Sequence, residues 1–327
     1  PFYKQNRYSL YTKMFFLFII TYIFGTVTAK LLWHWDHEPH HVNINYVLIQ
    51  KFDYIDQTAQ FGIGEDDSLS IQQDPTNPSQ YVLSVFYRQG TFSDHDHNGN
   101  KCTSHTKCQR GAQFYINPKS IRQEASTHLF TDMTLEYEIY FNHTFQWRNG
   151  GKLPGLWGGF RNCSDGRHDH CFSTRLMWRT GGQGEVYAYV PQQQKIGTTF
   201  ESWCASLKHR EIYHKIECPG DYGIEIGTGA FSFSTGKWIK ITQHVHLNNP
   251  HGYGSVTLWV NDNAEIHMND IVMRNQFNFG IQGIFFSTFY GGHDHDWACP
   301  ADTTTLYRNF RLYTESPPLV PSQLLVG

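Results

Sequence analysis

The chain has 327 residues, of which 39% are hydrophobic, 17% are charged and 16% are aromatic. This composition is typical of a globular protein, and the length allows one large core or two modest ones. The net charge of −3 argues against nucleic-acid binding, which usually needs a basic domain. The many aromatic residues and glycines favour β structure. Aromatic rings also suit sugar binding, although they serve equally well to fill a sandwich core.

Residues 1–29 are predicted to be an upstream extension followed by a signal peptide. Met14 is preceded by basic residues and followed by the apolar run Phe15–Phe24. Ten apolar residues are too few to span a bilayer, but they fit the apolar region of a signal peptide. The sequence V-T-A then offers a cleavage site. We therefore expect a secreted, extracellular protein that begins near Lys30 and has no membrane contact after signal removal.

Short strand-like runs alternate with Gly, Asn, Asp and Pro turns along the rest of the chain. Apolar and polar residues alternate with a period of two in several runs, which is typical of strands with one buried face. No stretch shows a sustained apolar period of 3.6 residues, so one short helix at Lys119–Glu124 is all that we expect. The clearest predicted strands are 43–50 (N-I-N-Y-V-L-I-Q), Tyr81–Arg88, Gln113–Ile116, Thr134–Phe141, Ser173–Arg179, Glu185–Val190, Trp238–Leu247, Gly254–Asn261, Gly283–Tyr290 and Tyr307–Tyr313.

This succession of strands predicts an all-β fold, a β-jelly-roll sandwich of two antiparallel sheets. Neither an internal repeat nor a Pro/Ser-rich linker divides the sequence, so a single domain is expected at residues 30–314. The proline-containing tail, residues 315–327, is expected to be a loose terminus.

The seven cysteines agree with export, because they fall as three local pairs and the single Cys299. Pairing between near neighbours is the simplest hypothesis in an oxidising compartment. A zinc site is the alternative, but the C-x-x-C spacing is missing. N-H-T at Asn142 and N-C-S at Asn162 are candidate glycosylation sites. The expected disulfides join Cys102 to Cys108, Cys163 to Cys171 and Cys204 to Cys218.

Residues 146–195 form a basic block in an acidic protein. They hold seven basic and three acidic side chains, a net charge of +4, whereas the remainder of the chain carries −7. A local positive block fits a cleft for a polyanion, since the field of a charge cluster acts locally. Scattered solvated charge is the alternative interpretation.

Two predicted strands in this block place polar and aromatic side chains on one face. Their other faces are apolar and belong to the core, so the polar faces should line the outer, concave side of a sheet. The linker T-G-G-Q-G between them predicts a hairpin. A five-residue turn would pair Arg179 with Glu185, Met177 with Tyr187, and Arg175 with Tyr189, with Ser173 one step away.

Lys152 lies in the glycine-rich run G-G-K-L-P-G-L-W-G-G. Glycines allow close approach of the backbone to a ligand or a positive φ. The run lacks the G-K-[ST] ending of a phosphate loop. A structural lysine on a tight turn is the alternative to a catalytic one.

These residue types match what β-elimination on a uronic acid requires. The C5 proton becomes removable when the neighbouring carboxylate is neutralised, and Arg175 could do this by bidentate hydrogen bonding. A tyrosine or lysine whose pKa is lowered by nearby cations can take that proton, and a tyrosine can protonate the departing O4. Hydrolysis needs a carboxylate pair, whereas this segment offers only Glu185 on the relevant face. Elimination is therefore favoured.

The same segments resemble polysaccharide lyase family 14, the alginate and glucuronate lyases. The resemblance rests on G-G-K-L-P-G-L-W-G-G, C-F-S-T-R-L-M-W-R and G-E-V-Y-A-Y-V-P, and it continues in W-I-K-I-T-Q-H-V-H-L-N, G-S-V-T-L-W-V-N, F-F-S-T-F-Y-G-G and Y-R-N-F-R-L-Y. It covers most of residues 130–313, whereas residues 30–130 carry no matching motif. It implies a jelly roll with a concave-face cleft that works without an essential metal. The family's catalytic residues fall on Lys152, Ser173, Arg175, Tyr187 and Tyr189.

We therefore predict a secreted polysaccharide lyase that cleaves a 1,4-linked uronic-acid polymer, alginate first and glucuronan second. No cofactor is expected, and the enzyme should act as a monomer on acidic polysaccharide. Two alternatives stay open: a lectin-like sandwich that binds carbohydrate without catalysis, and a glycoside hydrolase on a similar sandwich. Further substrate contacts are predicted for Arg148, Trp178, Arg179 and His293.

Three histidine–aspartate clusters, at 94–97, 168–170 and 293–296, could also ligate a metal. Polar loops are the simpler interpretation. The third cluster follows the strand Gly283–Tyr290 at a G-G turn, which should bring His293 to the rim of the cleft.

Overall fold

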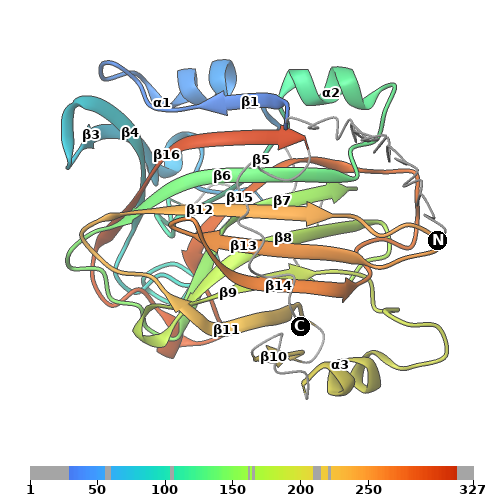
Figure 1. Cartoon of the computed structure of the whole chain (residues 1–327). Coiled ribbons are helices and arrows are strands. Elements are labelled where there is room, and N and C mark those ends of the chain that lie inside the picture. The colour runs from blue at the N-terminus through green and yellow to red at the C-terminus, as the bar shows by residue number, and fades with distance from the viewer. Residues whose placement is uncertain are drawn as a thin grey trace, which may run out of the picture.

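The computed structural model describes residues 29–55, 60–103, 107–160, 163, 166–208, 215–219 and 222–314. Two antiparallel sheets pack against each other, with one large apolar core between them (Figure 1). The predicted all-β sandwich is confirmed. The predicted leader, apart from Ala29, and the predicted tail lie outside the described residues. Within the described part, no helix is long and apolar enough to cross a membrane.

Sheet A has eight strands in the order β14-β13-β12-β6-β16-β4-β3, with β1 also paired to β16. The alternation predicted for the run at 238–247 is confirmed, because Ile239, Ile241 and Val245 are buried in the core. The strands of sheet A are β1 (Leu31–Trp35), β3 (Leu69–Asp74), β4 (Asn77–Tyr87), β6 (Asp132–Phe141), β12 (Trp238–His246), β13 (Gly254–Val260), β14 (Asn263–Ile271) and β16 (Thr303–Thr314).

Sheet B also has eight strands, in the order β10-β11-β9-β8-β7-β15-β5-β2. Its inner face contributes Leu153, Leu176 and Val186 to the core. Its outer face carries Lys152, Arg175, Tyr187 and Tyr189. Its strands are β2 (Tyr54–Ile55), β5 (Ala112–Ile116), β7 (Gly150–Gly159), β8 (Cys171–Arg179), β9 (Gln183–Tyr189), β10 (Ile216–Glu217), β11 (Ile224–Ser232) and β15 (Ile281–Tyr290).

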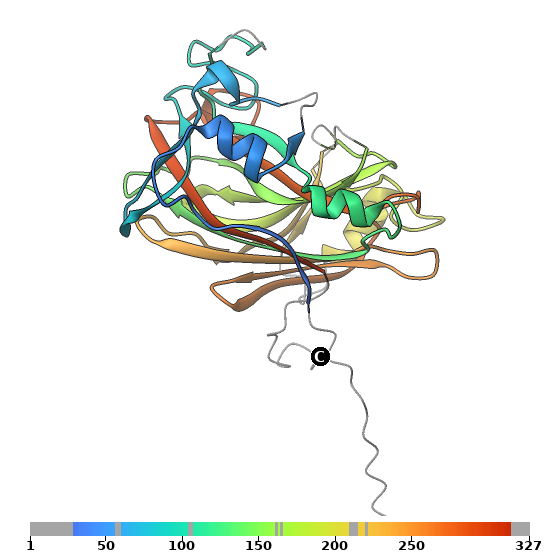
Figure 2. The same ribbon diagram turned by 90° about the horizontal axis from the view of Figure 1, so that it is seen from above.

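Helices α1 and α2 lie along one edge of the sandwich and α3 lies at the opposite edge (Figures 1 and 2). The predicted helix at Lys119–Glu124 is confirmed as α2. The strand predicted at 43–50 is wrong: Asn43 caps a helix by accepting a hydrogen bond from the Asn45 amide at 2.8 Å. The helices are α1 (Ile44–Tyr46), which continues as a π-helix at Val47–Lys51, α2 (Lys119–Ala125) and α3 (Phe200–Lys208), and short 3₁₀ turns cover Gly64–Asp66, Thr180–Gly182 and His295–Trp297.

Helix α3 was not expected from the sequence. Its buried residues, Phe200, Trp203, Cys204 and Leu207, recur at helical spacing, so the expectation of a single short helix is wrong. The pattern spans only two turns, which is why it does not stand out in a β-rich sequence.

The β8–β9 hairpin differs in register from the prediction. Only Thr180–Gly182 connect the strands, and Gly181 and Gly182 both have positive φ values, of 72° and 83°. The shorter turn shifts the pairing by two residues, so Arg175 opposes Tyr187 and Ser173 opposes Tyr189. A two-residue shift leaves every side chain on its predicted face, because side chains alternate with a period of two.

Candidate active site

The outer face of sheet B brings the five predicted catalytic residues together. Opposed residues of neighbouring antiparallel strands share a face and lie close to each other. The register of β7, β8, β9 and β11 therefore arranges their side chains in rows across the sheet. One row is Lys152, Met177 and Glu185; the next is Arg175, Tyr187 and Glu225; the third is Trp157, Ser173 and Tyr189.

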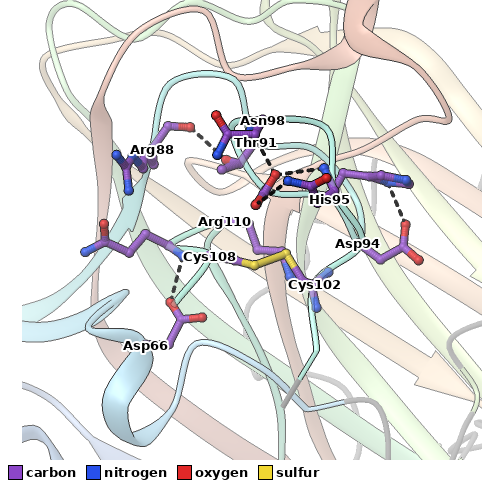
Figure 3. The surroundings of a disulfide bond; sticks show 12 residues. Asp66, Arg88, Thr91, Asp94, His95, Asn98, Cys102, Cys108 and Arg110 are labelled. Carbon is purple, nitrogen blue, oxygen red and sulfur yellow. Dashed lines mark hydrogen bonds and ion pairs between the residues drawn. A yellow bond between two sulfur atoms is a disulfide. The ribbon is translucent and has the colours of Figure 1, made fainter. Parts of the chain in front are cut away.

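A cleft of about 470 Å³ opens above these rows. Its floor includes Lys152, Arg175, Tyr187 and Tyr189. One wall comes from Ser93 and Asp94, and the Asp94 carbonyl accepts a hydrogen bond from the amide of Cys102, which is disulfide-bonded to Cys108 (Figure 3). Another comes from Pro219 and Tyr222, which follow the Cys204–Cys218 disulfide, and the remainder includes Glu225, Phe289, Gly291, Gly292, His293 and Trp297.

Lys152 is a buried amine with a lowered proton affinity. Its side chain is only 8% exposed. Its Nζ donates a hydrogen bond to Met177 Sδ at 2.7 Å and lies 3.2 Å from the centroid of the Tyr187 ring. Burial, together with the charges of Arg175 and Arg179, lowers the pKa of Lys152 well below its usual range. A neutral amine at this position can act as a general base.

Arg175 is 1% exposed and has spare hydrogen-bond donors. Its Nη1 donates to Ser287 Oγ at 3.0 Å, and its guanidinium lies 4.5 Å from the ring centroid of Phe285 and 4.9 Å from that of Tyr189. Within the described structure, Nε and Nη2 have no hydrogen-bond partner. Buried polar groups nearly always have one. Two adjacent free donors of a planar guanidinium match the two oxygens of a carboxylate.

Tyr187 and Tyr189 lie side by side, with ring centroids 5.5 Å apart in an edge-to-face arrangement. The Tyr187 hydroxyl accepts a hydrogen bond from the Gly223 amide at 3.3 Å. Burial and the neighbouring Tyr189 raise the pKa of Tyr187, so its phenol stays protonated. Ser173, which opposes Tyr189, is fully buried and donates from Oγ to the Cys163 carbonyl at 3.1 Å. The hydroxyl of Ser173 therefore links strand β8 to the backbone at Cys163.

Arg179 bridges two carboxylates at the end of the cleft. Its Nε donates to Glu185 Oε1 at 2.8 Å, and its Nη2 pairs with Glu225. Burial alone would lower the pKa of Arg179, but Glu185 and Glu225 raise it. Glu185 is fully buried and also accepts a hydrogen bond from Thr228 Oγ1 at 2.6 Å. The charge of Arg179 is thus largely compensated within the protein, unlike that of Arg175.

The glycine run around Lys152 forms strand β7 and not a tight turn. A Cβ on Gly151 would lie 2.1 Å from the Trp178 ring, and one on Gly155 would lie 2.1 Å from the Thr174 carbonyl oxygen. The pairing with β8 shifts between Leu153 and Leu156. Gln243 reaches across the core from sheet A, and its Oε1 accepts a hydrogen bond from the Leu156 amide at 3.1 Å. The glycines and this glutamine fix the strand that holds Lys152.

The structure corrects or limits the four predicted substrate contacts. Trp178 does not reach the cleft: it is fully buried in the core, and its indole donates to the Trp147 carbonyl at 2.9 Å. It occupies the inner face because it alternates with Met177 and Arg179 along β8. Arg148 is exposed in the turn before β7, outside the cleft lining. Arg179 and His293 do line the cleft.

Several supporting residues were missed at the sequence level. Ser287 holds Arg175 and is itself bonded to Gln113, with 2.9 Å between Ser287 Oγ and Gln113 Oε1. Glu225 opposes Tyr187, and Gln243 supports β7. The sequence does contain a sign of these residues, because each is a polar residue within a strand that is otherwise mostly apolar or β-branched. The partner of each residue could not be deduced without the strand order.

The histidine clusters form contacts within loops. In the described segments, no group of three or more His, Cys, Asp or Glu side chains could hold a metal ion. His95 stacks on Phe92 with ring centroids 4.7 Å apart, and His293 packs on Tyr222 at 5.2 Å. Of the two predicted glycosylation sites, Asn142 is partly exposed at the end of β6, and Asn162 lies outside the described residues.

All three predicted disulfides are confirmed, and Cys299 is a buried free thiol. Cys163 and Cys171 are fully buried and belong to one buried cluster with Met177, Tyr187 and Tyr189, which line the cleft. We expect the double variant Cys163→Ser/Cys171→Ser to lose about tenfold or more in kcat/KM, because small displacements of catalytic groups are costly. Cys102→Ser/Cys108→Ser, which removes the wall disulfide, should lose less. Steady-state rates and thermal melting of both variants check this, and equal losses would contradict it.

Fold and site together define a class of protein: a jelly-roll sandwich whose outer-face cleft holds a buried amine, an arginine with free donors and a tyrosine pair. The sequence model of the family Polysaccharide lyase 14 matches residues 75–310. The chain belongs to polysaccharide lyase family 14 and is a lyase, as the sequence predicted.

Solved structures support this assignment. The marine PL-14 alginate lyase from Aplysia kurodai is 32% identical, with a TM-score of 0.68, over 88% of this chain and 100% of that chain. An alginate lyase from Chlorella virus is 17% identical (TM-score 0.60; 87% and 100% covered), and an endo-β-1,4-glucuronan lyase from the fungus Trichoderma reesei is 8% identical (TM-score 0.51; 87% and 96% covered). At these lower identities the last two show the fold alone. A search of curated protein sequences gave no match.

Proposed function

We propose that this lyase cleaves a 1,4-linked uronic-acid polymer, alginate in the first place and glucuronan in the second, by β-elimination without a metal. The family and the similarity to the Aplysia kurodai alginate lyase support the substrate class. The observation that carries the proposal is the Arg175 guanidinium, buried on the cleft floor with Nε and Nη2 unpaired among the described residues. We also propose that the protein is secreted, because its three disulfides are typical of an oxidising compartment.

In the proposed reaction, Arg175 donates two hydrogen bonds to the uronate carboxylate. This interaction strengthens as negative charge moves onto the carboxylate oxygens, so it stabilises the transition state. The neutral amine of Lys152 takes the C5 proton. A double bond forms between C4 and C5 while the bond from C4 to O4 breaks, and the electron pair leaves with O4. A phenol is protonated at neutral pH, and Tyr189, which lies against Arg175, gives its proton to O4.

The two carboxylates of the cleft do not favour hydrolysis. A glycosidase needs two carboxyl groups on either side of the scissile bond. Of the two in the described lining, Glu225 pairs with Arg179. Asp94 belongs to the wall and pairs with Lys101 at 3.3 Å. Each carboxylate is thus already engaged by a basic side chain of the protein.

The test is incubation with alginate, polymannuronate, polyguluronate and glucuronan, with ultraviolet absorbance as the measure of 4,5-unsaturated uronate. We expect this absorbance to rise with alginate and to be unaffected by a chelator. New reducing ends without absorbance would indicate a hydrolase. Binding without either product would indicate a lectin.

Tyr189→Phe is expected to reduce kcat by about 10²–10⁴-fold, the usual contribution of a positioned proton donor. The ring remains, so thermal melting should be unchanged. Tyr222→Phe is the matched control, because Tyr222 lies in the cleft wall and is 43% exposed, and its rate should stay near that of the wild type. If Tyr189→Phe keeps its rate and Tyr187→Phe loses it, the donor is Tyr187.

A further inference from the structure

A second hollow, of about 500 Å³, lies at the other end of β7 and β15. It shares no described lining residue with the catalytic cleft. Its lining combines side-chain amides with aromatic and apolar groups, namely Ile55, Asn117, Trp157, Gly159, Phe160, Asn278, Phe279 and Gln282.

Two polar atoms of this lining are buried without a partner. Trp157 is 1% exposed, and its indole Nε1 makes no hydrogen bond within the described structure. The side-chain Oδ1 of Asn117 is also buried and unpaired there. A buried donor or acceptor without a partner destabilises the folded protein, so each of these atoms calls for a hydrogen-bond partner that water or a ligand can supply. The hollow thus offers one donor and one acceptor.

Trp157 places this hollow on the same face of sheet B as the catalytic rows. It opposes Ser173 on β8, and Ser173 opposes Tyr189 on β9. Along β7, Trp157 lies five positions after Lys152, roughly 16 Å of strand. This separation corresponds to several sugar units of an extended polysaccharide, so a chain bound at the cleft can reach the hollow.

The chemistry of the hollow differs from that of the cleft. No charged side chain is among its described lining residues. Phe160 lines the hollow and is 59% exposed, so a sugar ring can stack on it. Asn278 and Gln282 add amide donors and acceptors that suit hydroxyl groups. A site that binds carboxylates would need cationic hydrogen-bond donors such as those that Arg175 supplies in the cleft. The described lining of the hollow offers none.

From these observations we infer that the hollow is a distal saccharide subsite, which binds a sugar unit remote from the scissile bond through its ring face and hydroxyls. The inference rests on the proposed function, because the ligand is a further part of the same uronan chain. It predicts that the enzyme prefers long chains to short ones, and that the lining of the hollow determines this preference.

The test compares kcat and KM on polymeric alginate and on an alginate trisaccharide for wild type, Phe160→Ala and Asn117→Ala. Both variants should raise KM for the polymer by about tenfold while kcat and the trisaccharide kinetics stay unchanged, as expected for binding energy that acts equally in ground and transition states. Tyr253→Ala is the matched control, since Tyr253 is 43% exposed and lies outside this hollow, and its kinetics should equal those of the wild type.

Unchanged polymer KM in both variants, or an equal loss on polymer and trisaccharide, would overturn the subsite. Absence of unsaturated product with the wild type on every uronan would instead overturn the proposed function. Binding of the polymer to the Lys152→Ala background, measured by calorimetry, provides a readout independent of turnover. There, Phe160→Ala should weaken binding about tenfold, and equal affinity would also overturn the subsite.

Discussion

Replacement of Lys152 by methionine or alanine is expected to reduce kcat by about 10³-fold or more, since the base of the reaction is removed. The structure gives the reason why this lysine can be a base. Burial and the charges of Arg175 and Arg179 lower the pKa of Lys152, and its amine donates a hydrogen bond to Met177. The measurement is the initial rate of absorbance increase on alginate. Near-wild-type rates would remove Lys152 from the mechanism.

The same replacement is expected to stabilise the fold. Because the pKa of Lys152 is lower in the folded than in the unfolded chain, the unfolded chain binds a proton that the folded protein does not. Folding therefore becomes less favourable as the pH falls below the pKa of an unfolded lysine. Lys152→Met removes this cost at neutral pH, and melting should rise by about 2–4 °C for each kcal/mol gained. A clear fall in melting temperature would mean that Lys152 is charged in the folded protein and that its charge is stabilised by neighbouring groups.

The pH dependence of the wild-type activity follows from the same lowered pKa of Lys152. Protonation of Lys152 at acidic pH removes the base, so kcat/KM should fall as the pH drops through the pKa of that amine. Glu225 raises the pKa of Lys152, although its effect is smaller than those of burial and the arginines. Glu225→Gln should therefore move the acidic limb of the profile to lower pH. An unchanged limb would show that a different group sets it.

The faces of the catalytic strands could be predicted from sequence because the period of two is a local property. Ser173, Arg175 and Met177 alternate with apolar residues, and the core face of β9 reads directly as Val186 and Ala188. The pairing between the strands could not be predicted as reliably. It depends on how many residues of T-G-G-Q-G enter the turn, and two positive φ values at Gly181 and Gly182 allow a shorter turn than expected.

Strand β7 shows where local reasoning fails. Its glycines are typical of a loop, yet Gly151 and Gly155 are needed because Trp178 and the Thr174 carbonyl crowd the space where a Cβ would lie. Those neighbours come from β8, and the supporting Gln243 comes from sheet A. The same limit applies to the network of Ser287 and Gln113, whose partners are separated by 174 residues. Contacts of this kind require the sheet order, which no pattern in the sequence specifies.

Arg175→Lys is expected to reduce kcat by about 10²–10³-fold, the usual cost of losing one donor to a developing oxyanion. Lysine retains the charge but loses the planar pair of donors, so the result separates bidentate recognition from simple charge. Arg175→Ala should lose more activity than Arg175→Lys. Neither variant should unfold the protein. Ser287 keeps its hydrogen bond to Gln113. Because Nε and Nη2 of Arg175 have no partner in the described structure, their removal leaves no other described group without a hydrogen bond.

A substrate with a blocked carboxylate distinguishes this role of Arg175 from a structural one. Methyl esterification of the uronate removes the ground-state negative charge that Arg175 neutralises, so removal of the C5 proton depends less on the guanidinium. The ratio of wild-type to Arg175→Ala rates should then be much smaller on esterified than on free oligouronate. Tyr189→Phe should retain its full defect on both substrates, because O4 still needs a proton. Equal rate ratios for Arg175→Ala on the two substrates would show that this arginine shapes the cleft and does not neutralise the carboxylate.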